Sequence, residues 1–135
     1  MNEWTFDATI EKIPELTALV DERLEALECP IKAQMQIDVA IDELFSNVAN
    51  YAYENGVGRI TTRFEFDPDA REVRISFIDS GMPYNPLEKD DPDVSLPPEE
   101  RDIGGLGIYL VKKTMDALLY EYRDGRNIVT ICKRI

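Results

Sequence analysis

Three short segments of this sequence combine residue types that could do chemistry. In the first, Glu43, Asn47 and Tyr51 recur every four residues, a spacing that places them along one flank of a helix. Asparagine is a poor helix former, so the presence of both Asn47 and Asn50 indicates a task for these side chains. A carboxamide oxygen suits a hard cation such as Mg²⁺, and a carboxylate one turn away could accept a proton from a hydroxyl. A solvated polar flank of the helix is the alternative explanation.

The second segment ends a mainly apolar stretch, residues 75–78, with Asp79. The stretch has the pattern of a buried strand, which would deliver the carboxylate to the edge of a sheet. Gly81 follows closely and lets another group approach the backbone. A carboxylate in that place can accept a hydrogen bond from an exocyclic amino group, and an Asp-Ser-Gly turn without further function is the alternative.

The third segment is rich in glycine: Gly104, Gly105 and Gly107 surround Leu106 at the predicted start of a helix. Each glycine costs roughly 1 kcal/mol relative to alanine inside a helix, so three together imply a conformational or steric need. The free N–H groups and the positive end of the helix dipole form an anion site that needs no lysine. The segment has neither the Gly-Lys-Ser/Thr of a P-loop nor the preceding strand of a Rossmann turn. A flexible hinge is the alternative.

The elements that must position these segments can be predicted from hydrophobic periodicity and turn residues. Five prolines interrupt residues 80–103, which indicates a long loop. In chain order we expect a strand at 4–10, a helix from 14, a helix at 30–53, strands at 59–66 and 72–79, a helix at 104–115, and a hairpin of strands 118–123 and 127–134. This order predicts a single α+β domain, residues 1–135, built as a two-layer sandwich with helices on one face of a mixed, mostly antiparallel sheet.

The composition excludes several kinds of chemistry. The chain has 135 residues, no histidine and a formal net charge of −12. Without histidine there is no Ser-His-Asp triad and no histidine phosphoacceptor, and the negative charge disfavours binding to nucleic acid. We expect a cytoplasmic protein, because Cys29 and Cys132 lie far apart and neither a membrane span nor a signal peptide is evident. The acidic surface aids solubility and suits a basic protein partner.

In their order, the three segments resemble the N, G1 and G2 boxes of the Bergerat-fold (GHKL) ATPase superfamily. Residues 43–53 resemble the N box, residues 79–81 the G1 box and residues 105–111 the G2 box. Within the superfamily, the chain is most similar, over nearly its whole length, to the single-domain anti-sigma-factor serine/threonine kinases. The resemblance implies one histidine-kinase-like ATPase domain with the Bergerat ATP-binding fold.

The resemblance also implies a role for each matching position. Glu43 would be the catalytic base that takes the proton of a target serine, and Asn47 would ligate the Mg²⁺ that bridges the phosphates. Asp79 would bond the adenine amino group, with Gly81 giving room for the ring, and the glycine-rich turn would hold the phosphates under a lid at about 86–103. The complete expected ATP site is Asn47, Asn50, Tyr51, Asp79, Gly81, Pro83, Arg101, Gly104, Gly105, Leu106 and Gly107.

Three of these positions have open alternatives. Tyr51 stands where the family often has histidine, which alters any polar contact there. Asn50, where apolar residues are usual, would lean toward the phosphates or face water. Arg101 would contact a phosphate or form a salt bridge to Glu99 or Asp102.

The function implied by the resemblance is that of an ATP-dependent serine/threonine protein kinase and anti-sigma factor, with ATP and Mg²⁺ as cofactors. Its expected partners are an antagonist protein, as the phosphorylated substrate, and a sigma factor, which it sequesters. A homodimer is also implied, and direct contact with nucleic acid or a membrane is not. Two alternatives are a nucleotide-gated binding module without kinase activity and a detached histidine-kinase catalytic domain that acts on a partner.

Overall fold

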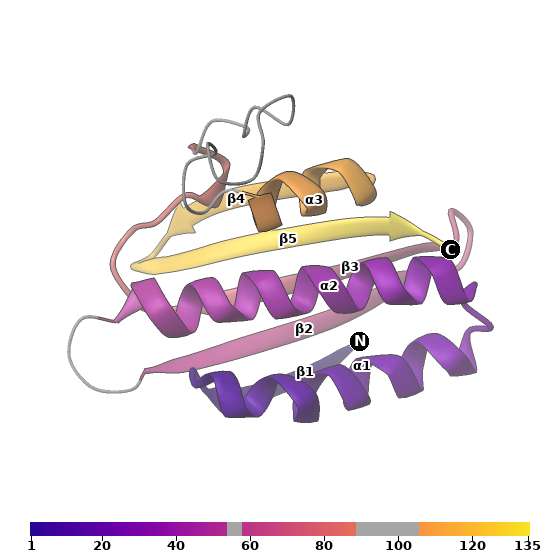
Figure 1. Cartoon of the computed structure of the whole chain (residues 1–135), viewed down its shortest axis with the longest axis horizontal. Coiled ribbons are helices and arrows are strands. Elements are labelled where there is room, and N and C mark those ends of the chain that lie inside the picture. Colours follow the sequence, from indigo (N-terminus) through magenta and orange to yellow (C-terminus); the bar gives the residue numbers. More distant parts are fainter. Residues whose placement is uncertain (54–57, 89–105) are drawn as a thin grey trace.

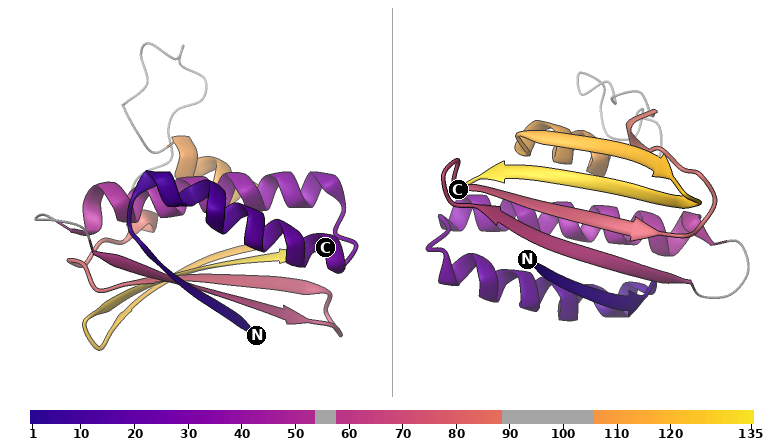
Figure 2. Two further views of the ribbon diagram at one scale, coloured as in Figure 1. Left: turned by 90° about the horizontal axis from the view of Figure 1, so that it is seen from below. Right: turned by 180° about the vertical axis from the view of Figure 1, so that it is seen from behind.

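Five strands form one sheet, and the helices pack on one of its two faces (Figures 1 and 2). The computed structural model describes residues 1–53, 58–88 and 106–135, and for Leu106 it describes the backbone alone. The strands are β1 (Asn2–Asp7), β2 (Arg59–Asp67), β3 (Glu72–Asp79), β4 (Ala117–Arg123) and β5 (Arg126–Arg134). The helices are α1 (Ile13–Ala26), α2 (Ile31–Asn47) and α3 (Leu106–Thr114), with short helical turns η1 (Ile10–Lys12), η2 (Val48–Ala52) and η3 (Pro86–Glu88). The expected two-layer α+β sandwich is confirmed.

The strand order is β1-β2-β3-β5-β4, and each neighbouring pair is antiparallel. The parallel pair that a mixed sheet would contain is not found among the described strands. The connection from β3 through α3 does bring β4 back parallel to β3, but β5 then returns between them and pairs with both. This arrangement sets Asp79, the last residue of β3, directly opposite Asn127 of β5.

The core lies between the helices and the inner face of the sheet. Apolar residues three and four apart on α2, such as Ile37, Ile41 and Leu44, are buried, as their periodicity predicts. Each such side chain contributes about 1.5–3 kcal/mol when it is removed from water. The core residues that are at most 1% exposed include Leu16, Val20, Leu24, Ile37, Ile41 and Phe45 on the helices and Ile60, Ile75, Phe77 and Ile131 on the strands. This packing fixes the C-terminal end of α2 over the ends of β3 and β5.

The end of the second helix differs from the expectation of a continuous helix to residue 53. Regular α-helix stops at Asn47, and a π-helical turn, η2, follows. A π turn closes hydrogen bonds over five residues rather than four, so it shifts the following side chains around the helix. Ala52, at the end of η2, accepts a hydrogen bond from the backbone N–H of Met82 at 2.9 Å. The turn therefore joins the end of the helix to the loop after β3.

The β4–β5 turn follows the prediction from its sequence. Asp124 and Gly125 both have positive φ, at 54° and 77°. Two successive positive φ angles are typical of the type I′ turn, whose twist matches that of the strands, and an Asp-Gly pair favours it.

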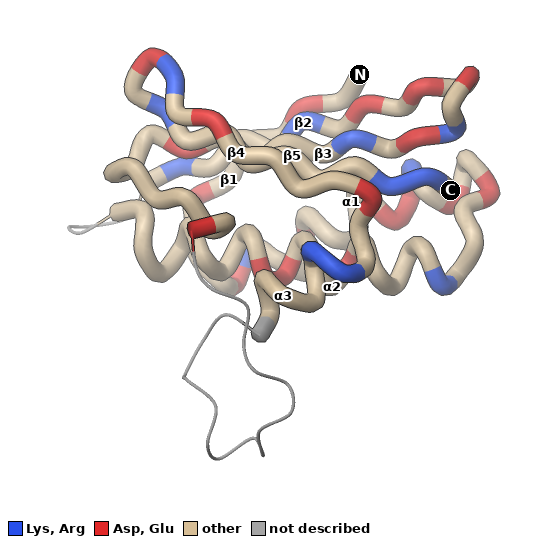
Figure 3. Tube along the Cα trace, turned by 90° about the horizontal axis from the view of Figure 1, so that it is seen from above, with Lys and Arg blue, Asp and Glu red and all other residues tan. Residues whose placement is uncertain are grey.

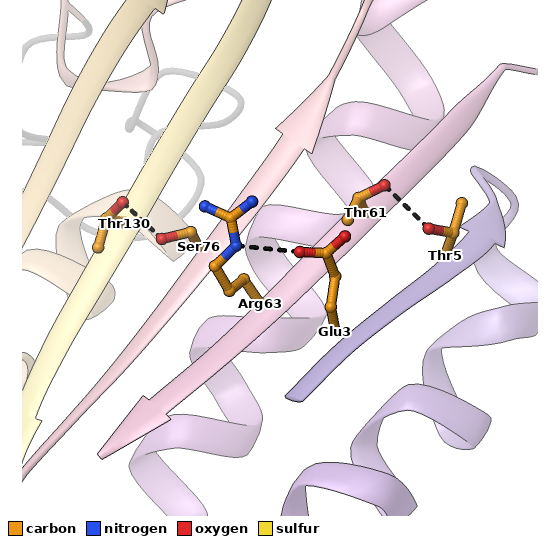
Figure 4. Close-up of polar contacts among 6 residues, drawn as sticks. All are labelled: Glu3, Thr5, Thr61, Arg63, Ser76 and Thr130. Carbon is orange, nitrogen blue, oxygen red and sulfur yellow. Dashed lines mark hydrogen bonds and ion pairs between the residues drawn. The ribbon is translucent and has the colours of Figure 1, made fainter. Parts of the chain in front are cut away.

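The face of the sheet away from the helices carries polar cross-strand pairs, and no described helix covers it (Figures 2 and 4). The pairs drawn in Figure 4 are Glu3–Arg63 (3.1 Å), Thr5–Thr61 (3.0 Å) and Ser76–Thr130 (3.0 Å). Acidic and basic residues both occur along these strands (Figure 3). Such pairs add modest stability to a solvated sheet face.

No helix in the described ranges has the length and apolar character needed to cross a bilayer.

Candidate functional site

The C-terminal end of α2 lies near the end of β3 and the start of β5 (Figure 1). Residues of these three elements line a pocket. The empty space between its walls, counted together with the open solvent at its mouth, is about 310 Å³. Asn47 of the first segment and Asp79 of the second both line this pocket, although they lie far apart in the sequence. Its lining residues are Leu44, Asn47, Val48, Ala52, Asp79, Tyr84, Pro86, Asn127 and Val129.

Asp79 is buried, and one of its two carboxylate oxygens is fixed. Its Oδ1 accepts hydrogen bonds from the backbone N–H of Gly81 and from Nδ2 of Asn127, both at 2.9 Å. Burial raises the pKa of this carboxyl, and these two hydrogen bonds partly oppose the rise. Within the described residues, Oδ2 accepts no hydrogen bond. This second oxygen can therefore accept a hydrogen bond from a ligand, for example from the amino group of a base.

Asn47 carries an unused hydrogen-bonding group in the same pocket. Its Nδ2 is buried and has no hydrogen-bond partner in the described part of the chain. An orphaned buried amide costs roughly 1–3 kcal/mol unless a ligand or water bonds to it. The donor suits a phosphate oxygen, and the amide turned by 180° presents an oxygen that suits Mg²⁺. The side chain thus fits the position expected for it beside a magnesium nucleotide.

The described residues do not supply a full set of ligands for a metal at Asn47. No group of three or more His, Cys, Asp or Glu that could hold a metal ion occurs within residues 1–53, 58–88 and 106–135. Mg²⁺ is commonly held by one or two protein groups, with waters and substrate phosphates completing its six ligands. The donor set therefore matches a Mg²⁺ that enters with a nucleotide.

Glu43 lies beside the first turn of α3. A Cβ at Gly107 would overlap the carboxylate of Glu43, so glycine is what allows this close approach. Burial, followed by the neighbouring Tyr51 and Glu43, raises the pKa of Tyr84, which lines the pocket. The carboxylate therefore lies near both the pocket and the start of α3, one helical turn before Asn47.

A close contact within the protein explains why residue 81 is glycine. A Cβ at this position would overlap the carbonyl group and the side chain of Ala52. The same contact brings Met82 N–H to the Ala52 carbonyl and holds Gly81 N–H on Asp79. The glycine thus lets the loop after β3 lie directly against η2.

The π turn directs Tyr51 and Asn50 to different places. The ring of Tyr51 is half exposed and stacks on Tyr84, with centroids 5.7 Å apart and an interplanar angle of 28°. Tyr51 therefore borders the pocket through another side chain. Asn50 is exposed and lines a separate hollow together with residues 8–11. Asn50 therefore lies toward solvent and is not among the residues that line the pocket beside Asp79.

Among the remaining expected site residues that the structure describes, neither Pro83 nor Gly107 lines the pocket. Pro83 is exposed, whereas Pro86, at the beginning of the expected lid, lines the pocket from η3. Leu106 begins α3, as expected for the end of a glycine-rich turn. The positions that lie outside the described residues are Arg101, Gly104, Gly105 and residues 89–103 of the expected lid.

The sequence analysis missed Tyr84 and Asn127 as pocket residues. Asn127 is 2% exposed and bonds directly to Asp79. A signal for it exists, because Asn127 shares the inward alternation of the last strand with Val129 and Ile131, where a polar residue is unusual. Tyr84 lies in a loop without periodicity, and nothing in its local sequence marks it.

Comparisons with known proteins agree with this geometry. The model of the family described as "Histidine kinase-like ATPase domain" matches residues 6–133. The serine-protein kinase RsbW of Bacillus cereus is 30% identical over 93 residues, which cover 67% of this chain and 58% of that protein. The serine/threonine-protein kinase BtrW of Bordetella bronchiseptica is 26% identical over 100 residues, which cover 74% of this chain and 70% of that protein.

Among solved structures, a chain described as the RsbU and RsbW domains of Rv1364c from Mycobacterium tuberculosis contains a region with this fold. The TM-score is 0.67 at 18% identity, and the match covers 99% of this chain and 32% of that one. The family match spans nearly the whole chain, and the two relatives above are named as serine-protein and serine/threonine-protein kinases. The chain belongs to the histidine kinase-like ATPase domain family.

Proposed function

We propose that this chain is an ATP-dependent serine/threonine protein kinase and anti-sigma factor. It would phosphorylate a small antagonist protein and sequester a sigma factor, and phosphorylation of the antagonist would keep the sigma factor bound. The observation that carries the proposal is that Asn47 and Asp79 line one pocket. Family membership supports ATP binding, and the names of the relatives RsbW and BtrW support serine/threonine kinase chemistry.

The base would lie at the Asp79 end of the pocket. The adenine amino group would donate to Asp79 Oδ2, since Oδ1 already accepts two N–H groups. Leu44, Val129 and the ring of Tyr84 supply apolar surface for the purine.

The phosphates would extend toward Asn47 and the start of α3. Mg²⁺, bound through Asn47 and the phosphates, would neutralise charge that builds up during transfer. The N-terminal N–H groups of α3 and the preceding Gly104 and Gly105 would donate to phosphate oxygens. Among the described residues no lysine or arginine lines the pocket, so in that part of the chain the neutral donors and the metal would offset the net charge of −12.

Glu43 would act as the general base. It would take the proton of the acceptor hydroxyl as that oxygen bonds to the γ-phosphorus, while the bond from this phosphorus to the β–γ bridging oxygen breaks and ADP leaves. Its carboxylate lies beside Gly107 at the start of α3, where the γ-phosphate is expected. Positioned proton transfer of this kind contributes about 10²–10⁴-fold to a rate.

The protein partners are proposed from charge and resemblance. With 27 acidic and 15 basic residues, the chain favours basic partner surfaces. A homodimer is proposed on the resemblance alone, and sedimentation at micromolar concentration would test it.

The test uses the substitution Glu43→Gln, with Asp42→Asn on the same helix as the matched control. Mg·ATP binding is measured by calorimetry, and transfer is measured with ATP labelled at the γ-phosphate and an antagonist encoded beside this protein. We expect Glu43→Gln to retain ATP binding and lose at least about 10²-fold in transfer, while Asp42→Asn behaves like the wild type.

The chemistry of the product separates the alternatives. An acid-stable phosphoserine or phosphothreonine supports the kinase, whereas an acid-labile phosphohistidine would identify a histidine-kinase domain acting on a partner. ATP binding without any labelled product would leave the nucleotide-gated binding module. An unchanged transfer rate in Glu43→Gln would remove this residue from the mechanism.

A further inference from the structure

The side chain of Asn127 uses its whole hydrogen-bonding capacity at the base end of the pocket. Its Oδ1 accepts from the backbone N–H of Tyr84 at 3.1 Å and from the hydroxyl of Tyr120 at 2.5 Å. Its Nδ2 donates to Oδ1 of Asp79 and to the carbonyl oxygen of Met82, both at 2.9 Å. A primary amide has two N–H donors and two acceptor lone pairs, so nothing is left unused.

These partners permit only one orientation of the amide. The backbone N–H of Tyr84 can only donate, and the carbonyl of Met82 and the Asp79 carboxylate can only accept. An amide turned by 180° would set its NH₂ against the Tyr84 donor and its oxygen against two acceptors. Because Asn127 is 2% exposed, water cannot relieve such contacts. The amide is therefore locked.

Through Asp79, the fixed orientation of the Asn127 amide affects the pocket. Asn127 Nδ2 and Gly81 N–H hold the same oxygen, Oδ1, of that carboxylate. The carboxylate cannot rotate without breaking both bonds, so Oδ2 has a fixed place as the remaining acceptor. Burial raises the pKa of Asp79, and the hydrogen bonds from Asn127 and Gly81 oppose part of that rise.

We propose that Asn127, held by Tyr84 and Met82 and further bonded by the Tyr120 hydroxyl, is the positioning residue that makes this pocket select adenine over guanine. The proposal rests on the proposed function as an ATP-binding kinase. Adenine presents an amino donor to Asp79 Oδ2, whereas guanine presents its O6 acceptor at the equivalent place. A carboxylate oxygen that is fixed and carries no proton repels O6, whereas a carboxyl group that holds a proton can donate to it.

The substitutions form a graded series. Tyr120→Phe removes one of the two donors to Asn127 and leaves the bond to Asp79 possible. Asn127→Asp keeps the shape but sets a second carboxyl against Asp79, so that the pair holds a proton. Tyr122→Phe is the matched control, because Tyr122 lies on the same strand and is 46% exposed.

The main measurement is the ratio of the Kd for Mg·GTP to the Kd for Mg·ATP, obtained by calorimetry. We expect the wild type and Tyr122→Phe to prefer ATP by at least about 10²-fold. The preference should fall about 3-fold or more in Tyr120→Phe and about 10-fold or more in Asn127→Asp, since a protonated pair can donate to O6. Equal weakening of both nucleotides, with an unchanged ratio, would overturn the proposal.

A second measurement needs no nucleotide. The carboxyl carbon signal of Asp79 is titrated by NMR in the wild type and in Asn127→Leu. Loss of the amide donor should raise the pKa of Asp79, and an unchanged titration would also overturn the positioning role. A wild type that binds neither nucleotide would refute the proposed function itself, whereas normal ATP binding with unchanged selectivity would refute only the role of Asn127. Thermal unfolding identifies any variant that fails to fold, in which case Tyr120→Phe decides.

Discussion

Adding a single methyl group at position 81 should destabilise this chain even when no nucleotide is present. In Gly81→Ala the new Cβ would overlap the carbonyl oxygen, the carbonyl carbon and the Cβ of Ala52. None of these atoms belongs to a flexible side chain that could rotate away. The loop after β3 must therefore separate from η2, which breaks the bond from Met82 N–H to the Ala52 carbonyl.

The size of the effect follows from these contacts. The lost hydrogen bond contributes about 1 kcal/mol, and overpacking of a closed contact costs about 1–3 kcal/mol. Together these give a loss of about 2–4 kcal/mol in the free energy of unfolding. With an unfolding entropy of about 2.1 cal/mol/K per residue, the 135 residues lose about 3.5 °C in Tm per kcal/mol. The Tm should fall by about 7–14 °C.

Circular dichroism during heating measures this loss without nucleotide, and calorimetry measures Mg·ATP binding in parallel. Gly125→Ala is the control, because no atom lies within 4 Å of its new Cβ, although its φ of 77° is unfavourable for alanine. It should lose about 1–2 kcal/mol and keep its ATP affinity. If Gly81→Ala melts with the wild type and only its ATP affinity falls, then the glycine serves to admit the purine ring. The contact with Ala52 would not be the reason for it.

Three further changes test other parts of the structure. Burial, together with a hydrogen bond and the charge of Asp21, raises the pKa of Asp38 from 3.8 to about 8, so the folded state binds this proton more tightly than the unfolded state. The free energy of unfolding should therefore fall as pH rises from about 4 to about 8, by at most about 1.4 kcal/mol per pH unit and by less where water reaches the pair. Urea unfolding measured across this pH range should show a smaller pH dependence in Asp38→Asn than in the wild type. In Gly107→Ala the three atoms nearest the new Cβ all belong to the flexible end of Glu43, so Tm should change by less than about 4 °C while phosphotransfer falls at least about 10-fold. Equal transfer by both proteins would refute a catalytic position for this carboxylate. Tyr53→Phe removes a hydroxyl that donates to the carbonyl of Arg59 at 2.6 Å and accepts from the N–H of Ser80 at 3.0 Å, and a loss of about 1–2 kcal/mol in urea unfolding is expected.

The fold could be predicted where local sequence decides it. The stripe of Ile37, Ile41 and Leu44 has the period of a helix and is buried on one side. The Asp124-Gly125 pair has positive φ at both residues, which few other pairs tolerate. Local sequence does not determine whether neighbouring strands are parallel or antiparallel. That depends on β5, which lies between β3 and β4 and pairs with both. A mixed sheet was therefore expected where the strand pairs are antiparallel.

The site was predicted in its segments but not in its contacts. Periodicity counts 3.6 residues per turn, so it cannot detect the π turn that separates Asn50 from the pocket and sets Tyr51 against Tyr84. The glycine at position 81 signalled close approach of another group, yet the sequence does not say whether that group is a ligand or Ala52.

Asn127 shows what a closer reading of alternation could have added. In the last strand, residues 127, 129 and 131 face inward, and the second and third are Val129 and Ile131. A buried amide among apolar neighbours is stable only when its donors and acceptors are paired, so the pattern alone implies a polar partner on an adjacent strand. The sequence contains one strong candidate, Asp79, because it ends another apolar strand. Finding that the two are opposite each other requires the pairing of β3 with β5, which joins residues far apart in the chain and follows from the packing of the whole sheet. A polar residue at an inward strand position is thus evidence for a site before its partner is known.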